Sequence, residues 1–421
     1  AACVALSAAA ATKLVLVWTQ TPPVNVSSIP EQRSDKARMV RLPDGTLVVF
    51  YLEAFKAPDG AQVFDLPARA FRDPNEVLYQ VSRDQGTTWT RSINLSGSTQ
   101  LWSKQVNLDG DAATPPVPYY GDNDKPTAVN VGDNILVTWR SRYCGDGASA
   151  DAALQKTVTY TELTPTVEVP YFCMMAARMA WNASTATLSL IDKQRISTGE
   201  RDAAQDTNAG SQNGFAIVWQ EDPAGTRLGD AEGPGDGGTG ASVSGGTEAW
   251  YSYISVGSGQ SYGRTYAWPV TAISANAGTA RGASRVNVAL AAQQAVMAYE
   301  ESKGLSALRG KYIRYHAFTM SAPPAPAAGC IISDPLENAR RVRMLTQGAS
   351  AGSTNVVFLY RQGLGDQGAP ADVMMRRAVG GFTPDKIAGV PVADCTVTPT
   401  TVDEVSALAA KYTAAALNLS S

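Results

Sequence analysis

The stretch Ser82-Arg83-Asp84-Gln85-Gly86-Thr87-Thr88-Trp89 decides how this chain folds. Asp84 and Gly86 suit a turn, because an Asp side chain can accept hydrogen bonds from the backbone of its own turn and Gly permits a positive φ. Residues 76–81 before it are rich in strand formers, and residues 91–95 can return antiparallel to them. The stretch therefore predicts a β-hairpin turn with a structural role and no catalytic one.

A plan of strand, turn and strand recurs along the chain. The copies cover residues 35–51, 124–139, 201–219, 285–299 and 340–360, and their closing aromatic residues lie 88, 80, 80 and 61 residues apart. A second pair of strands can follow each copy, at residues 76–95, 173–190, 249–273, 311–332 and 371–391. Four strands per unit, repeated around an axis, are typical of a propeller blade.

We therefore predict an all-β fold, a single β-propeller of four-stranded antiparallel blades. Five blades can be counted, and a sixth would have to be assembled from the two ends of the chain. Residues 1–30 are expected to be an N-terminal arm in which residues 13–20 form a ring-closing strand. Residues 31–396 would form the propeller.

Residues 397–421 are expected to form a short amphipathic helix and tail. Thr401-Val402-Asp403-Glu404 fits a capping box, and apolar residues recur at helical spacing at Val405, Leu408, Tyr412, Ala415 and Leu419. The helix would pack on its own domain or against a neighbouring subunit, and the first arrangement is favoured.

Composition supports many short strands joined by turns. The 421 residues include 37 Gly and 24 Pro, and only 17% are charged. The formal net charge of -3 argues against a nucleic-acid partner, which would need a basic surface. No run of about 20 apolar residues is present, so no transmembrane span is expected.

The five cysteines suit disulfides. None forms a C-x-x-C pair and His316 is the only histidine, which excludes c-type haem attachment and most zinc sites. Cys144 and Cys173 fall within one repeat, and Cys330 and Cys395 bracket another, so we predict these two bridges with Cys3 left over. Buried free thiols are the alternative. The pairing would imply an exported protein.

The pattern at residues 82–89 also carries a family resemblance. Ser82, Asp84, Gly86, Thr88 and Trp89 match S-x-D-x-G-x-T-W, which resembles the Asp-box of the bacterial neuraminidase repeat. The resemblance implies that Asp84 accepts hydrogen bonds from the backbone of its own turn, that Gly86 adopts a positive φ, and that Trp89 packs between neighbouring sheets. Residues 45–50, Gly-Thr-Leu-Val-Val-Phe, resemble a strand at the start of sialidase catalytic domains. Where that family has the arginine that grips the sialic acid carboxylate, this chain has residues 35–37, Asp-Lys-Ala.

Three other arginines are candidates for ligand binding. Arg201, Arg285 and Arg341 occupy similar positions in later units and would bind an anionic sugar if they line the central channel. The alternative is that they form structural salt bridges with Asp35, Asp124 and Asp202. No tyrosine nucleophile or acid-base carboxyl can be assigned by spacing, so we name no catalytic residue.

Calcium is the one metal that the sequence suggests. Clustered oxygen ligands in loops suit this ion, and Asx-turns explain the same residues equally well. The candidates are Asp109, Asp111, Asp122, Asp124, Asp230, Glu232 and Asp236.

A second resemblance bears on location. Residues 219–223, 233–237, 297–304 and 310–315 look like segments of bacterial surface proteins called choice-of-anchor proteins, a group without an assigned activity. This implies an exported cell-surface module that binds or assembles without catalysis, partnered with another surface protein or a larger extracellular assembly. A sialidase-like glycoside hydrolase or lectin is the alternative. Long loops at residues 54–75, 103–123 and 221–248 would carry function or mediate assembly.

Overall fold

The computed structural model describes residues 23–27, 32–111, 113–145, 154–228, 241–242, 244–256, 270–308, 310–348, 350–363 and 371–420. This part of the chain is nearly all β-structure and is dominated by five four-stranded antiparallel sheets. We number them blades 1 to 5 in chain order. Within each blade the strands are hydrogen-bonded in the order in which they follow one another along the chain.

The strands of the five blades have the following bounds. Blade 1 contains β1 (Ser34–Arg41), β2 (Leu47–Ala54), β5 (Asn75–Ser82) and β6 (Ile93–Asn94). Blade 2 contains β9 (Asn123–Val131), β10 (Asn134–Ser141), β13 (Cys173–Asn182) and β14 (Thr187–Arg195). Blade 3 contains β15 (Asp202–Ser211), β16 (Gly214–Asp222), β19 (Glu248–Ile254) and β20 (Val270–Ala272). Blade 4 contains β21 (Ala283–Ala291), β22 (Gln294–Ser302), β23 (Lys311–Thr319) and β24 (Cys330–Ile331). Blade 5 contains β25 (Asn338–Gln347), β26 (Asn355–Gly363), β27 (Asp372–Ala378) and β28 (Leu417–Asn418).

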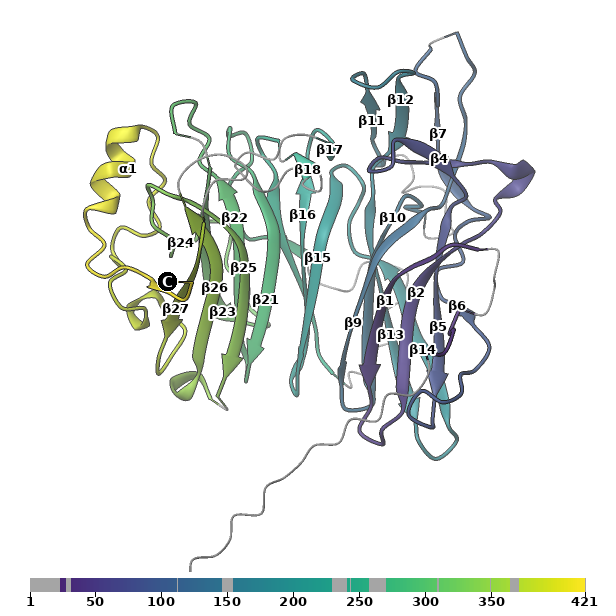
Figure 1. Cartoon of the computed structure of the whole chain (residues 1–421), viewed down its shortest axis with the longest axis horizontal. Helices are drawn as coiled ribbons and strands as arrows, with labels where there is room; N and C mark the ends of the chain where they lie inside the picture. Colours follow the sequence, from purple (N-terminus) through teal and green to yellow (C-terminus); the bar gives the residue numbers. More distant parts are fainter. Residues whose placement is uncertain are drawn as a thin grey trace, which may run out of the picture.

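The first strands of successive blades lie side by side, so that β1, β9, β15, β21 and β25 follow one another. Figure 1 shows the sheets as a row, with blade 5 at one end and blades 1 and 2 at the other. The predicted all-β propeller is confirmed, and its described part is an arc of five blades. The fourth strand of blade 5 comes from the C-terminal tail. The expected ring-closing strand at residues 13–20 lies outside the described residues.

The core lies between neighbouring blades. Apolar runs in the second strands of blades 2 to 4 are buried on both sides, because each of these blades has a neighbour on each face. A serine after each fourth strand of blades 1 to 4 accepts a hydrogen bond from a backbone N–H of the third strand. The pairs are Ser96 with Val77, Ser197 with Met174, Ser274 with Ala249, and Ser333 with Ile313.

The turn between β5 and β6 has the hydrogen bonds expected of it. Asp84 Oδ1 accepts from the Thr88 backbone N–H at 2.8 Å, and Gly86 has a φ of 92°. Hydrogen bonds from Thr88 lower the pKa of Asp84 to about 2. Trp89 packs on Val49, Tyr51 and Leu78 of its own blade. The expectation that it lies between two sheets is not met among the described residues, because blade 1 is at the end of their arc and none of them forms a blade beyond it.

Both predicted disulfides, Cys144–Cys173 and Cys330–Cys395, are present and confirm the pairing. The first joins the loop after β10 to the start of β13. The second joins β24 to the segment that leads into the C-terminal helix. The covalent links therefore hold one loop of blade 2 and the returning C-terminal tail against the propeller.

The C-terminal helix α1 (Val402–Ala409) is shorter than the sequence pattern suggests. Thr401 accepts a hydrogen bond from the Glu404 backbone N–H, as a capping residue does. Leu408 and Tyr412 pack on blade 4, so the helix covers its own propeller. The other predicted contact positions, Ala415 and Leu419, lie beyond the helix. None of the helices in the described residues is long and apolar enough to cross a membrane.

Three hairpins form a small subdomain above blades 1 to 3, at the upper right of Figure 1. They are β3 (Val63–Asp65) with β4 (Ala70–Arg72), β7 (Trp102–Val106) with β8 (Val117–Tyr120), and β11 (Thr157–Tyr160) with β12 (Val167–Pro170). They share a core of their own that includes Phe64, Val106, Tyr119 and Tyr160. Two of these hairpins occupy the long loops at residues 54–75 and 103–123.

The remaining short elements lie in loops. The third long loop, residues 221–248, is partly described and carries β17 (Arg227–Leu228) and β18 (Ala241–Ser242). Single 3₁₀ turns occur at Pro58–Gly60, Ala351–Ser353 and Pro384–Lys386.

Candidate functional site

A charged pocket of about 120 Å³ lies where the hairpin subdomain meets the inner strands of blades 1 to 3. Its lining has seven basic side chains, Arg33, Lys36, Arg72, Lys125, Arg140, Arg142 and Arg227. Its five acidic side chains are Asp35, Asp65, Asp122, Asp124 and Asp202. Phe64, Tyr160 and Phe172 contribute aromatic walls. Basic groups therefore exceed acidic ones in a partly enclosed space.

Two equivalent β-bulges, one in β1 and one in β9, place the two lysines of the pocket in its lining. The register of β1 shifts between Asp35 and Arg38, and Lys36 inside the bulge has a φ of 53°. Lys125 takes the same place in β9, with a φ of 50°. Such left-handed backbone costs about 1 kcal/mol for a residue other than glycine. In each case the preceding aspartate, Asp35 or Asp124, accepts a hydrogen bond from the lysine backbone N–H, which stabilises the bulge.

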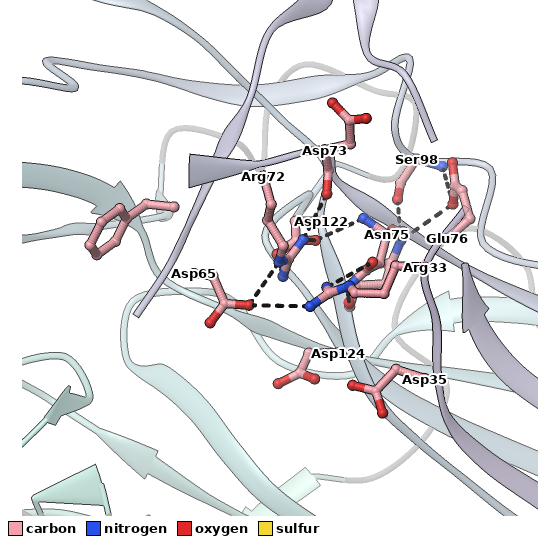
Figure 2. Close-up of polar contacts among 12 residues, drawn as sticks. Arg33, Asp35, Asp65, Arg72, Asp73, Asn75, Glu76, Ser98, Asp122 and Asp124 are labelled. Atoms are coloured by element: carbon pink, nitrogen blue, oxygen red, sulfur yellow. Dashed lines mark hydrogen bonds and ion pairs between the residues drawn. The ribbon is translucent and has the colours of Figure 1, made fainter. Parts of the chain in front are cut away.

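Arg72 is fixed by two carboxylates. Its two terminal nitrogens donate to the two oxygens of Asp122 at 2.8 and 2.9 Å, and its Nε donates to Asp65 at 2.8 Å. Burial disfavours the charged guanidinium, but Asp122 and Asp65 outweigh burial and raise the pKa of Arg72. Figure 2 shows Arg33 facing the same Asp65, with Asp124 and Asp35 below Arg33 in this view. Each of the three guanidinium nitrogens of Arg72 thus donates to a group of the protein.

Asp124 links blades 1 and 2. It accepts hydrogen bonds from Lys36 Nζ of blade 1 and from Arg140 Nε at 3.0 Å. Burial would raise the pKa of Asp124, but Arg140 and Lys36 outweigh it and hold this pKa well below its usual range. The carboxylate therefore stays charged and occupied.

The floor of the pocket is fully buried. The Arg142 guanidinium lies 3.9 Å from the centre of the Phe172 ring, and the Tyr160 hydroxyl donates to the Thr226 carbonyl at 2.9 Å. Asp202 accepts from the backbone N–H groups of Phe172 and Thr226, each at 2.7 Å. Burial raises the pKa of Asp202 and raises that of Tyr160 well above the ordinary value for tyrosine. These groups hold the loops together and face little solvent.

The rim is the accessible part. The side chains of Arg33, Lys36 and Arg227 are 49%, 38% and 42% exposed. Arg33 lies 3.9 Å from Asp65, and Arg227 lies 3.1 Å from the equally exposed Glu162. Such half-exposed pairs contribute little to stability, so their cations can turn toward an incoming anion.

The arginines proposed from the sequence lie outside this pocket. Arg201 donates to the Glu221 carbonyl at 3.1 Å, and Arg285 Nε lies 3.5 Å from Glu300 Oε1. The Arg341 backbone N–H donates to the same Glu300 oxygen at 2.7 Å. The arginines do not pair with the expected aspartates in these contacts.

Asp35, Asp124 and Asp202 do come together in the pocket lining, held by lysine, arginine and backbone partners. Lys36 and Lys125 share their bulge position with Arg285 (φ 51°) and Arg341 (φ 61°). Aligning the repeats on the bulge would have selected these four cations and left out Arg201, which precedes β15. The pocket arginines on loops carry no repeat signal, so the sequence alone did not point to them.

The calcium candidates do not form a metal site in the described residues. Asp109 accepts from the Asp111 backbone N–H at 3.0 Å, and Asp111 accepts from that of Ala113 at 2.9 Å, as in Asx-turns. Asp122 and Asp124 are occupied by arginine and lysine. Asp230, Glu232 and Asp236 lie outside the described residues. In the described part of the chain, no group of three or more His, Cys, Asp or Glu side chains is placed to hold a metal ion.

The structure is similar to sialidase structures. Over 83% of this chain it matches a Hadza microbial sialidase with a TM-score of 0.36 and 13% identity, covering 57% of that chain. It matches the NanB sialidase from Streptococcus pneumoniae with a TM-score of 0.36 and 8% identity, over 82% of this chain and 59% of that one.

A third match is the intramolecular trans-sialidase from Ruminococcus gnavus, with a TM-score of 0.38 and 10% identity, over 85% of this chain and 83% of that one. The chain thus spans less than two thirds of the length of the first two structures. No protein-family model matches the chain, and no curated protein matches it significantly.

Proposed function

We propose that this protein is an exported, non-catalytic binding module whose charged pocket binds an anionic ligand, an acidic glycan being the class that suits it. The observation that carries the proposal is the excess of basic groups around the pocket, three of which are partly exposed at its rim. Arg33 and Arg227 can each offer two parallel N–H donors to a carboxylate. Lys36 adds a partly exposed point charge at the rim, where it pairs with Asp124.

Binding without hydrolysis is favoured because the groups that could react are engaged elsewhere. Glycoside hydrolysis needs two available carboxyl groups or an equivalent pair. The pocket tyrosine, Tyr160, is buried and its raised pKa disfavours the phenolate that a nucleophile needs. Asp122 and Asp124 are each held by an arginine. The alternative, a sialidase-like hydrolase, would require these contacts to rearrange.

Export is supported by the two disulfides, because such bonds persist in oxidising compartments. The resemblance to bacterial choice-of-anchor proteins adds a cell-surface location as part of a larger extracellular assembly. In this proposal the propeller is a rigid platform, and its loops and end faces provide the binding surfaces.

Calorimetric titration of the full chain with sialyllactose and with lactose tests the proposal. We expect the acidic sugar to bind more tightly, and the Arg33→Gln/Arg227→Gln double variant to lose about tenfold in affinity, or about 1.4 kcal/mol. The matched control is Arg83→Gln/Arg91→Gln, which removes two exposed arginines away from the pocket. Equal affinity for the two sugars, or equal loss in both variants, would contradict the anion site. Release of sialic acid from a fluorogenic sialoside would contradict the non-catalytic role.

A further inference from the structure

The outward face of blade 5, the face turned away from blade 4, is exposed and apolar. On the opposite side Val356, Phe358 and Tyr360 are buried against blade 4. On the outward side Leu345, Leu359, Val373 and Leu417 are 70%, 36%, 42% and 55% exposed. We call this surface the blade 5 face.

These residues are contiguous across the sheet. Leu359 of β26 pairs with Met375 of β27, and Met375 pairs with Leu417 of β28. Leu345 of β25 pairs with Val357, which lies two residues before Leu359 on the same face of β26. Directly paired residues of antiparallel strands share a face. Exposed apolar residues are normal when they are scattered, but a continuous apolar patch marks an interaction surface.

The sequence of β26 has the pattern of a strand that is buried on both sides. Residues 356–360, Val-Val-Phe-Leu-Tyr, form an uninterrupted apolar run, like residues 295–299 of β22 and 215–219 of β16. In β16 and β22 every residue of the run is buried, because a blade lies on each side. In β26 the alternate residues Val357 and Leu359 are half-buried and exposed, respectively. The sequence of this strand therefore predicts a neighbouring layer on its outward side, and the described part of the chain does not supply one.

The charge of the blade 5 face restricts what that neighbour can be. Arg343, Arg361 and Arg377 are exposed on it, paired with Leu359, Val373 and Val357 respectively. Among the described residues, the register places no acidic side chain on this face. Since the whole chain has a net charge of -3, the face is a local basic surface on an acidic protein.

Two occupants fit this charge poorly. Residues 1–22 contain Lys13 as their single charged residue and offer no carboxylate. A second copy packed face to face about a two-fold axis would bring the same three arginines together. Either occupant would take arginines out of water without a partner, which is costly. A surface that combines apolar side chains with carboxylates would bury the leucines and pair the arginines.

We propose that the blade 5 face is a docking surface for an acidic partner protein that presents apolar side chains flanked by carboxylates. The proposal is independent of the charged pocket, which lies on blades 1 to 3.

The test uses the full chain and two fluorescein-labelled β-hairpin peptides. One face of the first peptide alternates leucine with glutamate, and the second has lysine in place of each glutamate. Fluorescence anisotropy should show that the glutamate peptide binds and that added salt weakens it. Leu345→Gln/Leu359→Gln and Arg361→Gln/Arg377→Gln should each weaken binding about tenfold. All four residues lie on the surface, so thermal unfolding should be unchanged in both variants.

The matched control is Leu190→Gln/Ile191→Gln, which removes a pair of apolar residues of β14 that are 49% and 48% exposed. It should leave binding unchanged. Binding of the lysine peptide with equal affinity, binding of neither peptide, or an equal loss in the control would overturn the proposal. Two further results would also overturn it. Self-association that Arg361→Gln/Arg377→Gln alters would assign the face to a second copy, and peptide binding only after removal of residues 1–22 would assign it to the N-terminal arm.

Discussion

Blades 1 and 5 end the same arc, yet their outward faces differ. On blade 1, Val49, Tyr51 and Leu78 are buried beneath Trp89, Phe55 and Val26. On blade 5, Leu345 and Leu359 are exposed, and Arg343, Arg361 and Arg377 are exposed on the same face. Both second strands are apolar without interruption. An uninterrupted apolar run therefore predicts that both faces of the strand are buried. The layer that buries the outward face can be a turn of the same chain, as on blade 1, or a separate partner.

The largest expected effect concerns what holds the blade 5 end together. Cys330–Cys395 closes a loop of 65 residues and fixes the segment that returns to supply β28, whereas Cys144–Cys173 closes 29 residues in blade 2. Loop-closure entropy predicts losses of about 4 and about 3.5 kcal/mol on replacing each pair by serine. Chemical unfolding of the two double variants measures both. A negligible loss for Cys330→Ser/Cys395→Ser would mean that packing alone fixes the tail.

Truncating a leucine at each end sharpens the comparison directly. Leu78→Ala on the covered face removes a side chain that is 3% exposed and should cost about 3 kcal/mol. Leu345→Ala, at 70% exposure, should change the free energy of unfolding by less than about 0.5 kcal/mol. Urea denaturation of both variants decides the matter. Equal losses would show that the isolated chain covers its own blade 5 face.

In the interior blade 3, the contribution of one buried carboxyl group to stability should depend on pH, which allows a comparison with the two end blades. Glu221 of blade 3 is buried and accepts a hydrogen bond from Trp219 Nε1 at 2.8 Å, and burial raises its pKa from 4.5 to about 7. Between these pH values the folded state keeps a proton that the unfolded state has released. The contribution of Glu221 to stability therefore falls as the pH rises from 4.5 to 7 and stays low above pH 7.

Glu221→Gln should remove that dependence and raise the free energy of unfolding at pH 8, relative to wild type, by on the order of 2 kcal/mol. Subtracting the two pH profiles isolates the glutamate from His316, whose pKa burial lowers to about 3 and which acts in the opposite direction below pH 6.5. A difference that does not vary between pH 4.5 and 7 would show that Glu221 is solvated in solution.

The repeat pattern was sufficient for the blades because each one contains the same local information. The apolar runs, the turn at residues 82–89 and the Cys144–Cys173 pair all depend on residues within one blade, whereas Cys330–Cys395 joins blade 4 to the tail that follows blade 5. The N-cap at Thr401 was predicted for the same reason, although Glu404 accepts from the Thr400 N–H and not from that of Thr401, so the capping box is incomplete. The hairpin subdomain could not be read in this way, because its core is assembled from three loops that are far apart in the sequence.

The pocket was missed for a related reason. Its arginines, such as Arg72 and Arg142, lie on those loops or at strand ends, and each has a different carboxylate or carbonyl partner. The bulge also adds one residue to each inner strand. When the repeats are aligned by the starts of their strands, Arg201 is therefore aligned with Arg285 and Arg341. Only the register shifts show that Lys36 and Lys125 are the equivalent positions.

The smallest expected loss of stability from removing a buried or bonded group is at the cap of α1, the helix that packs on blade 4. Thr401 accepts the Glu404 N–H, and Glu404 in turn accepts from the Thr400 N–H. Thr401→Ala should cost about 1 kcal/mol, because the Glu404 N–H in the first turn of the helix would lose its side-chain acceptor. Thr396→Ala, at an exposed residue outside the cap, is the control. If hydrogen exchange shows that Thr401→Ala frees the C-terminal segment without affecting β27, blade 5 does not need the helix, and its outward face is available to a partner whether or not α1 is docked.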